Sequence, residues 1–261
     1  MSNKTLDFDQ GHWILAKMGK RVLRPGGKEL TMKLIENMNI QSTDEVVEFA
    51  PGLGYTASVA LRNNPKSYTG IELNEEAASI LNKTIIGNNG YDRRIVVANA
   101  SNSTLSENSY DKVYGEAMLT IQADHRKSEI IKEAYRILKP GALYGIHELG
   151  LTPDNLNEET KSTIQRELAQ TIKVNARPLT ISEWSKLSEN EGFKVVKVET
   201  NSMSLLELKR MIDDEGLLRT MKIIFNIIIH SKERKRILAM RETFRKYKDS
   251  MNAVVIIAQK E

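Results

Sequence analysis

The feature that most constrains how this chain can fold is the stretch of residues 46–56, which reads VVEFAPGLGYT. An apolar run ends in an acid and a glycine-containing turn, and residues 57–61 then begin a helix-like segment. A strand followed by a turn of little side-chain bulk and a helix N-terminus brings backbone N–H groups close to a ligand. The stretch therefore predicts a ligand site just past the carboxyl end of this strand.

Strand-like and helix-like segments alternate after this stretch. Further strands are expected at residues 67–72, 94–100, 110–114, 142–147, 192–198 and 252–258, and helices separate most of them, as at 74–81 and 127–138. Such alternation is typical of βαβ units and of a mostly parallel sheet. We therefore predict an α/β fold with a doubly wound, seven-stranded, mostly parallel sheet.

Three further segments are helical by pattern and interrupt this alternation: 157–173, 182–190 and 204–250. They read as insertions into one domain, because no repeat or low-complexity linker separates them. We expect a single domain over 1–261. Its core is expected to comprise 40–150, 191–203 and 251–261, and its helical cap 1–39, 151–190 and 204–250.

Composition limits the chemistry available to the chain. The sequence has no cysteine, which excludes disulfides, cysteine–zinc sites and thiol nucleophiles. No metal ligand is assigned. The N-terminus lacks an apolar signal core and no run of about 18 apolar residues is present, so a cytoplasmic protein without a spanning helix is expected.

Charge is unevenly distributed along the chain. The net charge is +4, and residues 205–249 contain twelve Lys or Arg against seven Asp or Glu. Such a local excess favours a solvated helix face, although it could also meet nucleic acid or an anionic membrane.

Two ligand patterns compete for the glycine turn. A dinucleotide site needs G-x-G-x-x-G, whose third glycine allows close helix–strand packing, and here Tyr55 occupies that position. The alternative pattern is acid-x-G-x-G-x-G, which residues 48–54 match except that Ala50 replaces the first glycine. The second pattern fits better.

With this motif the chain resembles the class I, Rossmann-like S-adenosylmethionine-dependent methyltransferases of the small-molecule type. The resemblance covers about 46–198 and the final strand, which it implies to be antiparallel. Further motifs occur in family order: an acid ending the second strand, a polar–Ala pair after the third, YDKV at 110–113 and RILKPGA at 136–142.

The resemblance implies S-adenosylmethionine as cofactor and names its contacts. The glycine turn would lie under the methionine part and Glu72 would take both ribose hydroxyls. Asn99 would meet the adenine amino group, although the family usually has Asp there; its amide oxygen can still accept this bond. The predicted cofactor-binding residues are Glu48, Ala50, Pro51, Gly52, Gly54, Glu72, Leu73, Asn99 and Ala100.

Methyl transfer asks little acid–base chemistry of the protein. The nucleophile must be held in line with the methyl–sulfur bond and shielded from water. A base is needed only when the acceptor is protonated and weakly acidic. Polar side chains at the carboxyl ends of the fourth and fifth strands are candidates, and the predicted catalytic residues are His147 and Glu116.

The acceptor is predicted to be a small, partly apolar metabolite. Residues 115–118 lack the Asp/Asn-Pro-Pro-Tyr/Phe stretch of enzymes that methylate exocyclic base amines, and types that need cysteine are excluded. No nucleic-acid partner is expected. Two alternatives stay open: a nucleic-acid- or ribosome-directed methyltransferase that uses the basic segment 209–248, and a non-catalytic cofactor-binding protein.

The segment 221–229, MKIIFNIII, allows three interpretations. It could be a packed helix that covers the core, or part of a lid over an apolar substrate pocket. It could also touch a membrane or a partner, since Lys232, Arg234, Lys235 and Arg236 follow it, so peripheral membrane contact through 221–236 is possible. The turn at 24–27 could close the other side of the site, but a plain turn between two helices is the favoured interpretation. The oligomeric state is left open.

Overall fold

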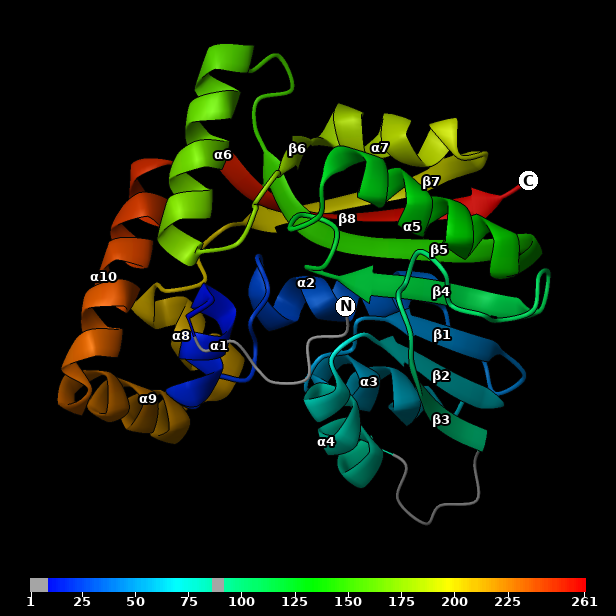
Figure 1. Cartoon of the computed structure of the whole chain (residues 1–261), viewed down its shortest axis with the longest axis horizontal. Coiled ribbons are helices and arrows are strands. Elements are labelled where there is room, and N and C mark those ends of the chain that lie inside the picture. Colours follow the sequence, from blue (N-terminus) through cyan, green and yellow to red (C-terminus); the bar gives the residue numbers. More distant parts are fainter. Residues whose placement is uncertain (1–8, 86–91) are drawn as a thin grey trace.

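One mixed sheet with helices on both faces and a helical cap at one end makes up the structure (Figure 1). It is a computed structural model that describes residues 9–85 and 92–261. The strands are β1 Glu45–Phe49, β2 Ser67–Glu72, β3 Asp92–Val97, β4 Tyr110–Glu116, β5 Leu138–Leu151, β6 Leu179–Thr180, β7 Phe193–Ser202 and β8 Met251–Lys260.

The sheet has the predicted character. Its order is β3-β2-β1-β4-β5-β8-β7, and β6 pairs with β5 outside this path. Strands β1 to β5 are parallel where they pair, whereas β8 runs antiparallel to both β5 and β7. The doubly wound, mostly parallel sheet with an antiparallel last strand is therefore confirmed. The two-residue β6 was not predicted, because so short a strand shows no alternation.

Alternation along the strands sends side chains to two different helical layers. In β1, Val46 packs with α2 (Gly27–Met38), α3 (Tyr55–Ala60) and α4 (Glu75–Ile85). Val47 and Phe49 instead pack on the opposite face with α5 (Asp124–Ile137) and α7 (Ile181–Asn190). The central strand β1 is thereby buried on both faces, whereas the outer strands β3 and β7 are partly exposed.

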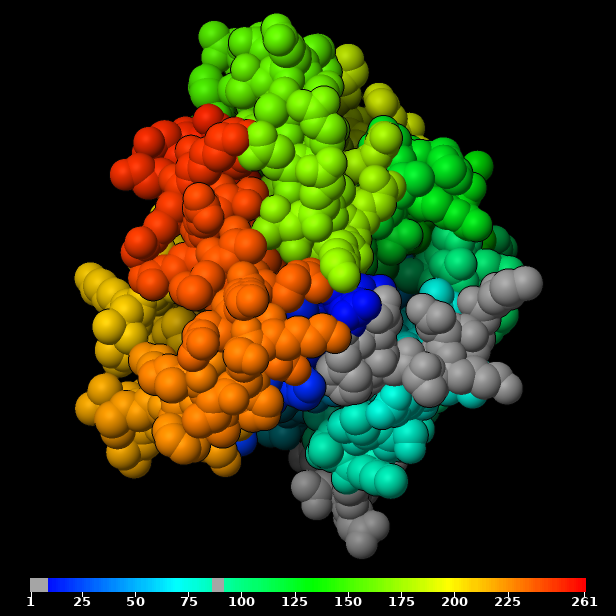
Figure 2. Space-filling view, turned by 60° about the vertical axis from the view of Figure 1, so that its left-hand side comes forward, coloured from blue at the N-terminus to red at the C-terminus, as the bar shows by residue number. Residues whose placement is uncertain are grey.

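Five helices form a cap beyond the carboxyl edge of the sheet, on the left of Figure 1. They are α1 Gly11–Lys17, α6 Glu158–Ile172, α8 Leu208–Glu215, α9 Leu217–Ile229 and α10 Ser231–Lys246. The space-filling view shows α10 and α6 side by side (Figure 2), and Lys246 pairs with Glu167 between them at 2.7 Å. The cap has its own apolar core, which includes Leu149, Leu151 and Met251 from the ends of β5 and β8.

The cap differs from the predicted division in two helices. Helix α2 belongs to the sheet layer, because its stripe of Leu30, Leu34 and Met38 packs against the strands. Helix α7 also lies on the sheet, where Trp184 is fully buried in the opposite layer. The segments 1–39 and 151–190 therefore contribute α1 and α6 to the cap, and residues 1–8 lie outside the described part of the chain.

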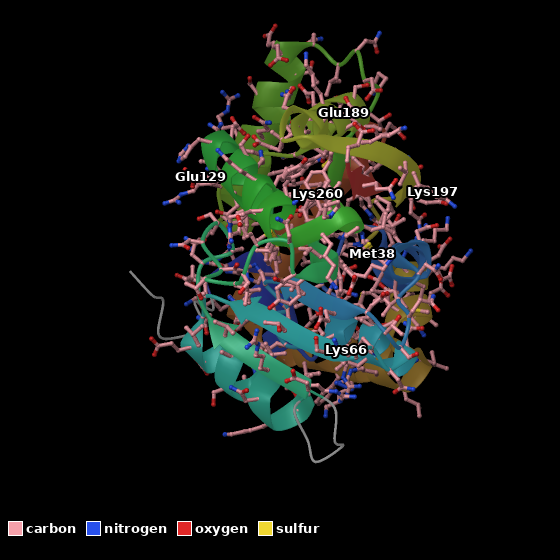
Figure 3. The ribbon with its side chains drawn as sticks, turned by 90° about the vertical axis from the view of Figure 1, so that its right-hand side faces the viewer. Met38, Lys66, Glu129, Glu189, Lys197 and Lys260 are labelled. Atoms are coloured by element: carbon pink, nitrogen blue, oxygen red, sulfur yellow. The ribbon has the colours of Figure 1, made fainter. Side chains whose placement is uncertain are left out.

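Figure 3 views the molecule from the side of the sheet's amino edge, with Lys66 and Lys260 labelled, and several ion pairs lie at this edge. Lys66 and Lys139 each approach Glu45 to 3.1 Å, and Lys139 also pairs with Asp111 at 2.9 Å. Lys260 donates to three oxygen atoms at this edge, including the carbonyl of Leu138.

Within the described ranges, no helix has both the length and the apolar character needed to cross a membrane.

Candidate active site

Two alanines line a crevice at the carboxyl edge of the sheet. Ala50 follows β1 and Ala117 follows the neighbouring β4, and both adopt φ of +52°. Non-glycine residues in this left-handed region are strained by about 1–2 kcal/mol, and such strain concentrates at functional sites. Ala50 thus adopts a backbone conformation that favours glycine, the residue which the predicted motif has at this position.

The two glycines of the turn have different surroundings. A Cβ atom added to Gly52 would meet nothing within 4 Å, whereas one added to Gly54 would lie 2.7 Å from Leu81 Cδ2. Both have positive φ, +59° and +82°. Gly52 therefore faces open space at the crevice, and Gly54 allows close packing on α4.

Glu72 ends β2 at the rim of this open space. Its Oε2 accepts from the N–H of Gly52 at 3.0 Å and its Oε1 from the N–H of Asn74 at 2.8 Å. Burial raises the pKa of Glu72, and these backbone N–H groups oppose the increase. Each carboxylate oxygen keeps a lone pair that can accept a ligand hydroxyl.

The other residues predicted near an adenine lie further out. Asn99 is exposed, and its Oδ1 accepts from the N–H and hydroxyl of Ser101 at 3.0 and 3.1 Å. Leu73 is also exposed, whereas Ala100 is buried. Their contact with a cofactor stays a prediction.

Glu48 lies beneath the turn and not in the open space. Its side chain is buried, and its Oε2 accepts from the hydroxyls of Tyr68 at 2.6 Å and Tyr114 at 2.9 Å. Burial raises its pKa to about 7, although the two hydroxyls act in the opposite direction. The carboxylate therefore ties β1 to both neighbouring strands.

This raised pKa predicts a pH-dependent stability. An acid whose pKa is higher in the folded state destabilises the fold as pH rises from about 4.5 to about 7. Glu48→Gln removes this titration. Between pH 5 and pH 8 the free energy of unfolding of the variant should therefore rise by about 2 kcal/mol relative to that of the wild type. Urea unfolding of both proteins at the two pH values measures the difference. An equal difference at both values would show that Glu48 does not titrate in this range.

The predicted catalytic residues Glu116 and His147 lie together in a buried network. Glu116 Oε1 is 2.7 Å from His147 Nδ1, and its Oε2 meets Thr56 Oγ1 and the guanidinium of Arg24. His147 Nε2 donates to the carbonyl of Pro25 at 2.6 Å. Burial alone would raise the pKa of Glu116, but Arg24, His147 and Thr56 outweigh it and lower the pKa to about 2.

The two residues of this pair differ in their access to the crevice. Glu116 lines the open space, whereas His147 is fully buried and both of its ring nitrogens are engaged. Arg24, Pro25 and Thr56 were not predicted as site residues. The turn at 24–27 was favoured as a plain connection between two helices, but Arg24 and Pro25 line the cavity.

Glu148 fixes the loop that follows β4. Its buried carboxylate accepts from the N–H groups of Met118, Leu119 and Thr120 at 2.8 to 3.0 Å, and also from the Thr120 hydroxyl. Burial raises the pKa of Glu148 despite these bonds. The loop that carries Ala117 is therefore rigidly placed.

The crevice continues into a cavity of about 320 Å³ between the sheet edge and the cap. Ala50, Pro51, Gly52 and Glu72 line its sheet side. The cap side is mostly apolar and includes Leu15, Leu168, Ile172, Met203, Leu205, Met240 and Phe244. These cap residues were missed, because their pattern alone reads as ordinary core.

The long insertion contributes to the cavity through only some of its parts. Met240 and Phe244 come from α10 and line the cavity, whereas no residue of 221–229 does, so the lid interpretation of the insertion stays a prediction. Helix α9 instead exposes most of its apolar side chains, which contradicts the packed-helix interpretation of 221–229. Among the described residues that line the cavity, none is a Lys or Arg of 209–248.

Comparison with known proteins identifies the family. A methyltransferase domain family matches residues 47–146, which extend from β1 into β5. An uncharacterized protein of Haemophilus influenzae is 33% identical over 252 residues, which cover 96% of this chain and 98% of that protein. The chain belongs to the class I, Rossmann-like S-adenosylmethionine-dependent methyltransferases. The predicted family is thereby confirmed.

Solved structures share the fold of this methyltransferase. The [4+2]-cyclase SpnF superimposes with a TM-score of 0.73 at 14% identity, over 97% of this chain and 94% of that one. The Haemonchus contortus phosphoethanolamine N-methyltransferase 2, in complex with phosphomonomethylethanolamine and S-adenosylhomocysteine, has a TM-score of 0.72 at 16% identity. That alignment covers 97% of this methyltransferase and 57% of the nematode enzyme.

Proposed function

We propose that this enzyme transfers a methyl group from S-adenosylmethionine to a small, partly apolar molecule held in the cap cavity. The observation that carries the proposal is the continuity of one cavity, from the glycine turn and Glu72 to the apolar residues of α6 and α10. Reactants that occupy the two ends of such a cavity meet away from bulk water, which favours group transfer.

The residues of the crevice fit the cofactor. Gly52 presents a backbone without side-chain bulk to open space, and Glu72 keeps acceptor capacity for two hydroxyl groups. In this proposal Gly52 and Gly54 belong to the turn beneath the methionine part, and Glu72 holds the ribose. The cofactor supplies an electrophilic methyl group on a sulfonium sulfur. Glu48 acts indirectly, because it fixes β1 and the turn.

The buried network suits positioning better than proton removal. Glu116, with a pKa of about 2 and an ion pair to Arg24, is a weak base. We propose that Glu116 and His147 hold Arg24 and Pro25 over the cavity. An acceptor whose attacking atom has a free lone pair suits such a site, because it needs no base.

Other observations bear on the alternatives. Two basic residues of 209–248, Arg241 and Arg245, pair with Glu207 within the cap, at 3.3 and 2.7 Å, and no described Lys or Arg of this segment lines the cavity. This favours a small acceptor over nucleic acid.

The cysteine-free sequence supports a cytoplasmic location for the enzyme. One structural neighbour is called a cyclase, so the fold by itself does not fix the reaction.

Two measurements test the proposal. Isothermal titration calorimetry is expected to show that one molecule of S-adenosylmethionine binds per chain. S-adenosylhomocysteine, titrated separately, should bind with the same stoichiometry. Labelled methyl transfer should then occur to apolar amines, acids or phenols of a small-molecule panel and not to bulk RNA or DNA. Transfer to RNA or DNA alone would overturn the small-acceptor proposal. Tight cofactor binding without transfer to either would indicate a cofactor-binding protein.

A further inference from the structure

Helix α9 turns its apolar face away from the protein. Seven of the fourteen large apolar side chains that are exposed among the described residues lie on this one helix. Leu218, Met221, Phe225 and Ile228 follow helical spacing along one face, and their exposed fractions range from 50 to 80%. An exposed stripe of this kind marks an interaction site.

The inner side of α9 fixes this orientation. Arg219 Nε donates to the carbonyl of Gly19 at 3.1 Å, and Asn226 Nδ2 donates to the carbonyl of Met18 at 2.9 Å. Ile223 and Thr220 are buried on the same side, and the Thr220 hydroxyl donates to the Met211 carbonyl. Rotation of the apolar face into the cap would break these contacts.

Positively charged residues lie on α9 and directly after it in the chain. Helix α9 carries Arg219 and Lys222 and no acid. Lys232 and Lys235 are exposed on the first turn and a half of α10, directly after α9. In the described part of the chain, Lys222, Lys232 and Lys235 form no ion pair, whereas the nearby Glu233 already pairs with Lys17 at 2.6 Å.

We propose that α9 docks this protein onto an anionic lipid surface, with its apolar face in the interface and the three lysines on the lipid phosphates. With 13 residues, α9 is too short to span a bilayer, which needs about 20. An amphipathic helix bordered by lysines is the form that lies in the membrane plane. Its place at the outer edge of the cap leaves it accessible (Figures 1 and 2).

Charge favours a lipid surface over a second copy of the chain. A two-fold contact would pair the same patch with itself. Helix α9 carries no carboxylate, and lysines lie on it and follow it, so two copies of this helix would bring like charges together. Lipid phosphates supply the opposite charge.

Vesicle flotation tests the proposal with the full-length protein. The vesicles contain either phosphatidylcholine alone or an equal mixture of phosphatidylcholine and phosphatidylglycerol. The wild type should float with the anionic vesicles and much less with the neutral ones, and added salt should weaken binding. The affinity of the double variant Phe225→Ser/Ile228→Ser for the anionic vesicles should be lower than that of the wild type by at least about tenfold.

Two further variants separate charge and surface apolarity from folding. Lys222→Glu/Lys232→Glu/Lys235→Glu should lose the preference for anionic vesicles. Val196→Ser removes a comparably exposed apolar side chain from β7, outside the cap, and should bind as the wild type does. Circular dichroism and cofactor binding confirm that each variant is folded.

The outcomes are decisive for the docking surface and independent of the proposed acceptor. Failure of the wild type to float with anionic vesicles, or undiminished flotation of Phe225→Ser/Ile228→Ser, would overturn the proposal. A dimer in sedimentation velocity that this variant dissociates, without vesicle binding by the wild type, would assign the face to a second copy. Loss of methyl transfer in the panel assay would leave the vesicle result unaffected.

Discussion

The Glu116→Gln variant is expected to lose about 3–5 kcal/mol of unfolding free energy at pH 7, because removal of one partner leaves buried charges uncompensated. Glu116 is buried, and its carboxylate meets Arg24, His147 and Thr56 at once. The amide keeps the shape of the side chain and removes its charge. Urea unfolding followed by circular dichroism measures the loss.

The stability difference between the wild type and Glu116→Gln should depend on pH in a defined direction. The pKa of Glu116 falls from 4.5 to about 2 on folding. An acid with a lowered pKa stabilises the fold fully above its unfolded value, and this contribution is lost as pH falls toward the folded value. The gap between wild type and Glu116→Gln should therefore shrink between pH 4.5 and pH 2. A difference in unfolding free energy that stays constant over this pH range would contradict an ionised Glu116 paired with Arg24.

A surface ion pair provides the control for Glu116. Glu45 pairs with Lys66 and Lys139 at the amino edge, where all three side chains are partly exposed. Solvent screens such pairs, so Glu45→Gln should cost no more than about 1 kcal/mol. Equal losses in the two variants would indicate that burial does not strengthen the Glu116 network.

The Gly52→Ala variant is expected to bind S-adenosylmethionine about a hundredfold more weakly, a loss near 3 kcal/mol. The added methyl group would meet no protein atom within 4 Å, so it enters the space that the ligand is proposed to occupy. The fold itself should lose only about 1–2 kcal/mol, from the left-handed backbone. Calorimetry measures the binding and thermal unfolding the stability.

Gly141→Ala is the matched control for this variant. Gly141 also has a positive φ, +77°, and a Cβ atom there would also meet nothing within 4 Å. It lies near the start of β5 at the amino edge, remote from the cavity. Both variants should lose similar stability, and only Gly52→Ala should lose affinity. Unchanged affinity in Gly52→Ala would place the cofactor elsewhere.

The sequence predicted where the strand ends and the glycine turn lie, because strand ends carry local signals; the contacts of these residues with a cofactor stay predictions. An apolar run that ends in an acid, and a turn with glycines, specify their own conformation; Glu72 and Gly52 therefore lie where the pattern indicated. Glu48 shows the limit of such signals. Its position at the end of β1 was predicted, but the pleat directs its carboxylate to Tyr68 and Tyr114 and away from the cavity.

The cap could not be predicted in the same way. Ile14 and Met240 belong to one apolar core although they lie at opposite ends of the chain, and helical periodicity does not reveal which stripes meet. The buried position of His147 depends on a carbonyl of the distant residue Pro25. The sequence of 221–229 left three roles open for this apolar segment, and the exposed side chains of α9 together with the contacts of Arg219 and Asn226 show that its apolar face points outward.

The division of the cavity between sheet and cap bears on how such enzymes diverge. The residues proposed to hold the methyl donor belong to the strand ends, whereas Leu168, Met240 and Phe244 belong to inserted helices. Mutations in the cap can thus alter the volume available to an acceptor while the donor site is retained. Descendants of one ancestral methyltransferase could in this way acquire new acceptors through changes in the inserted helices alone.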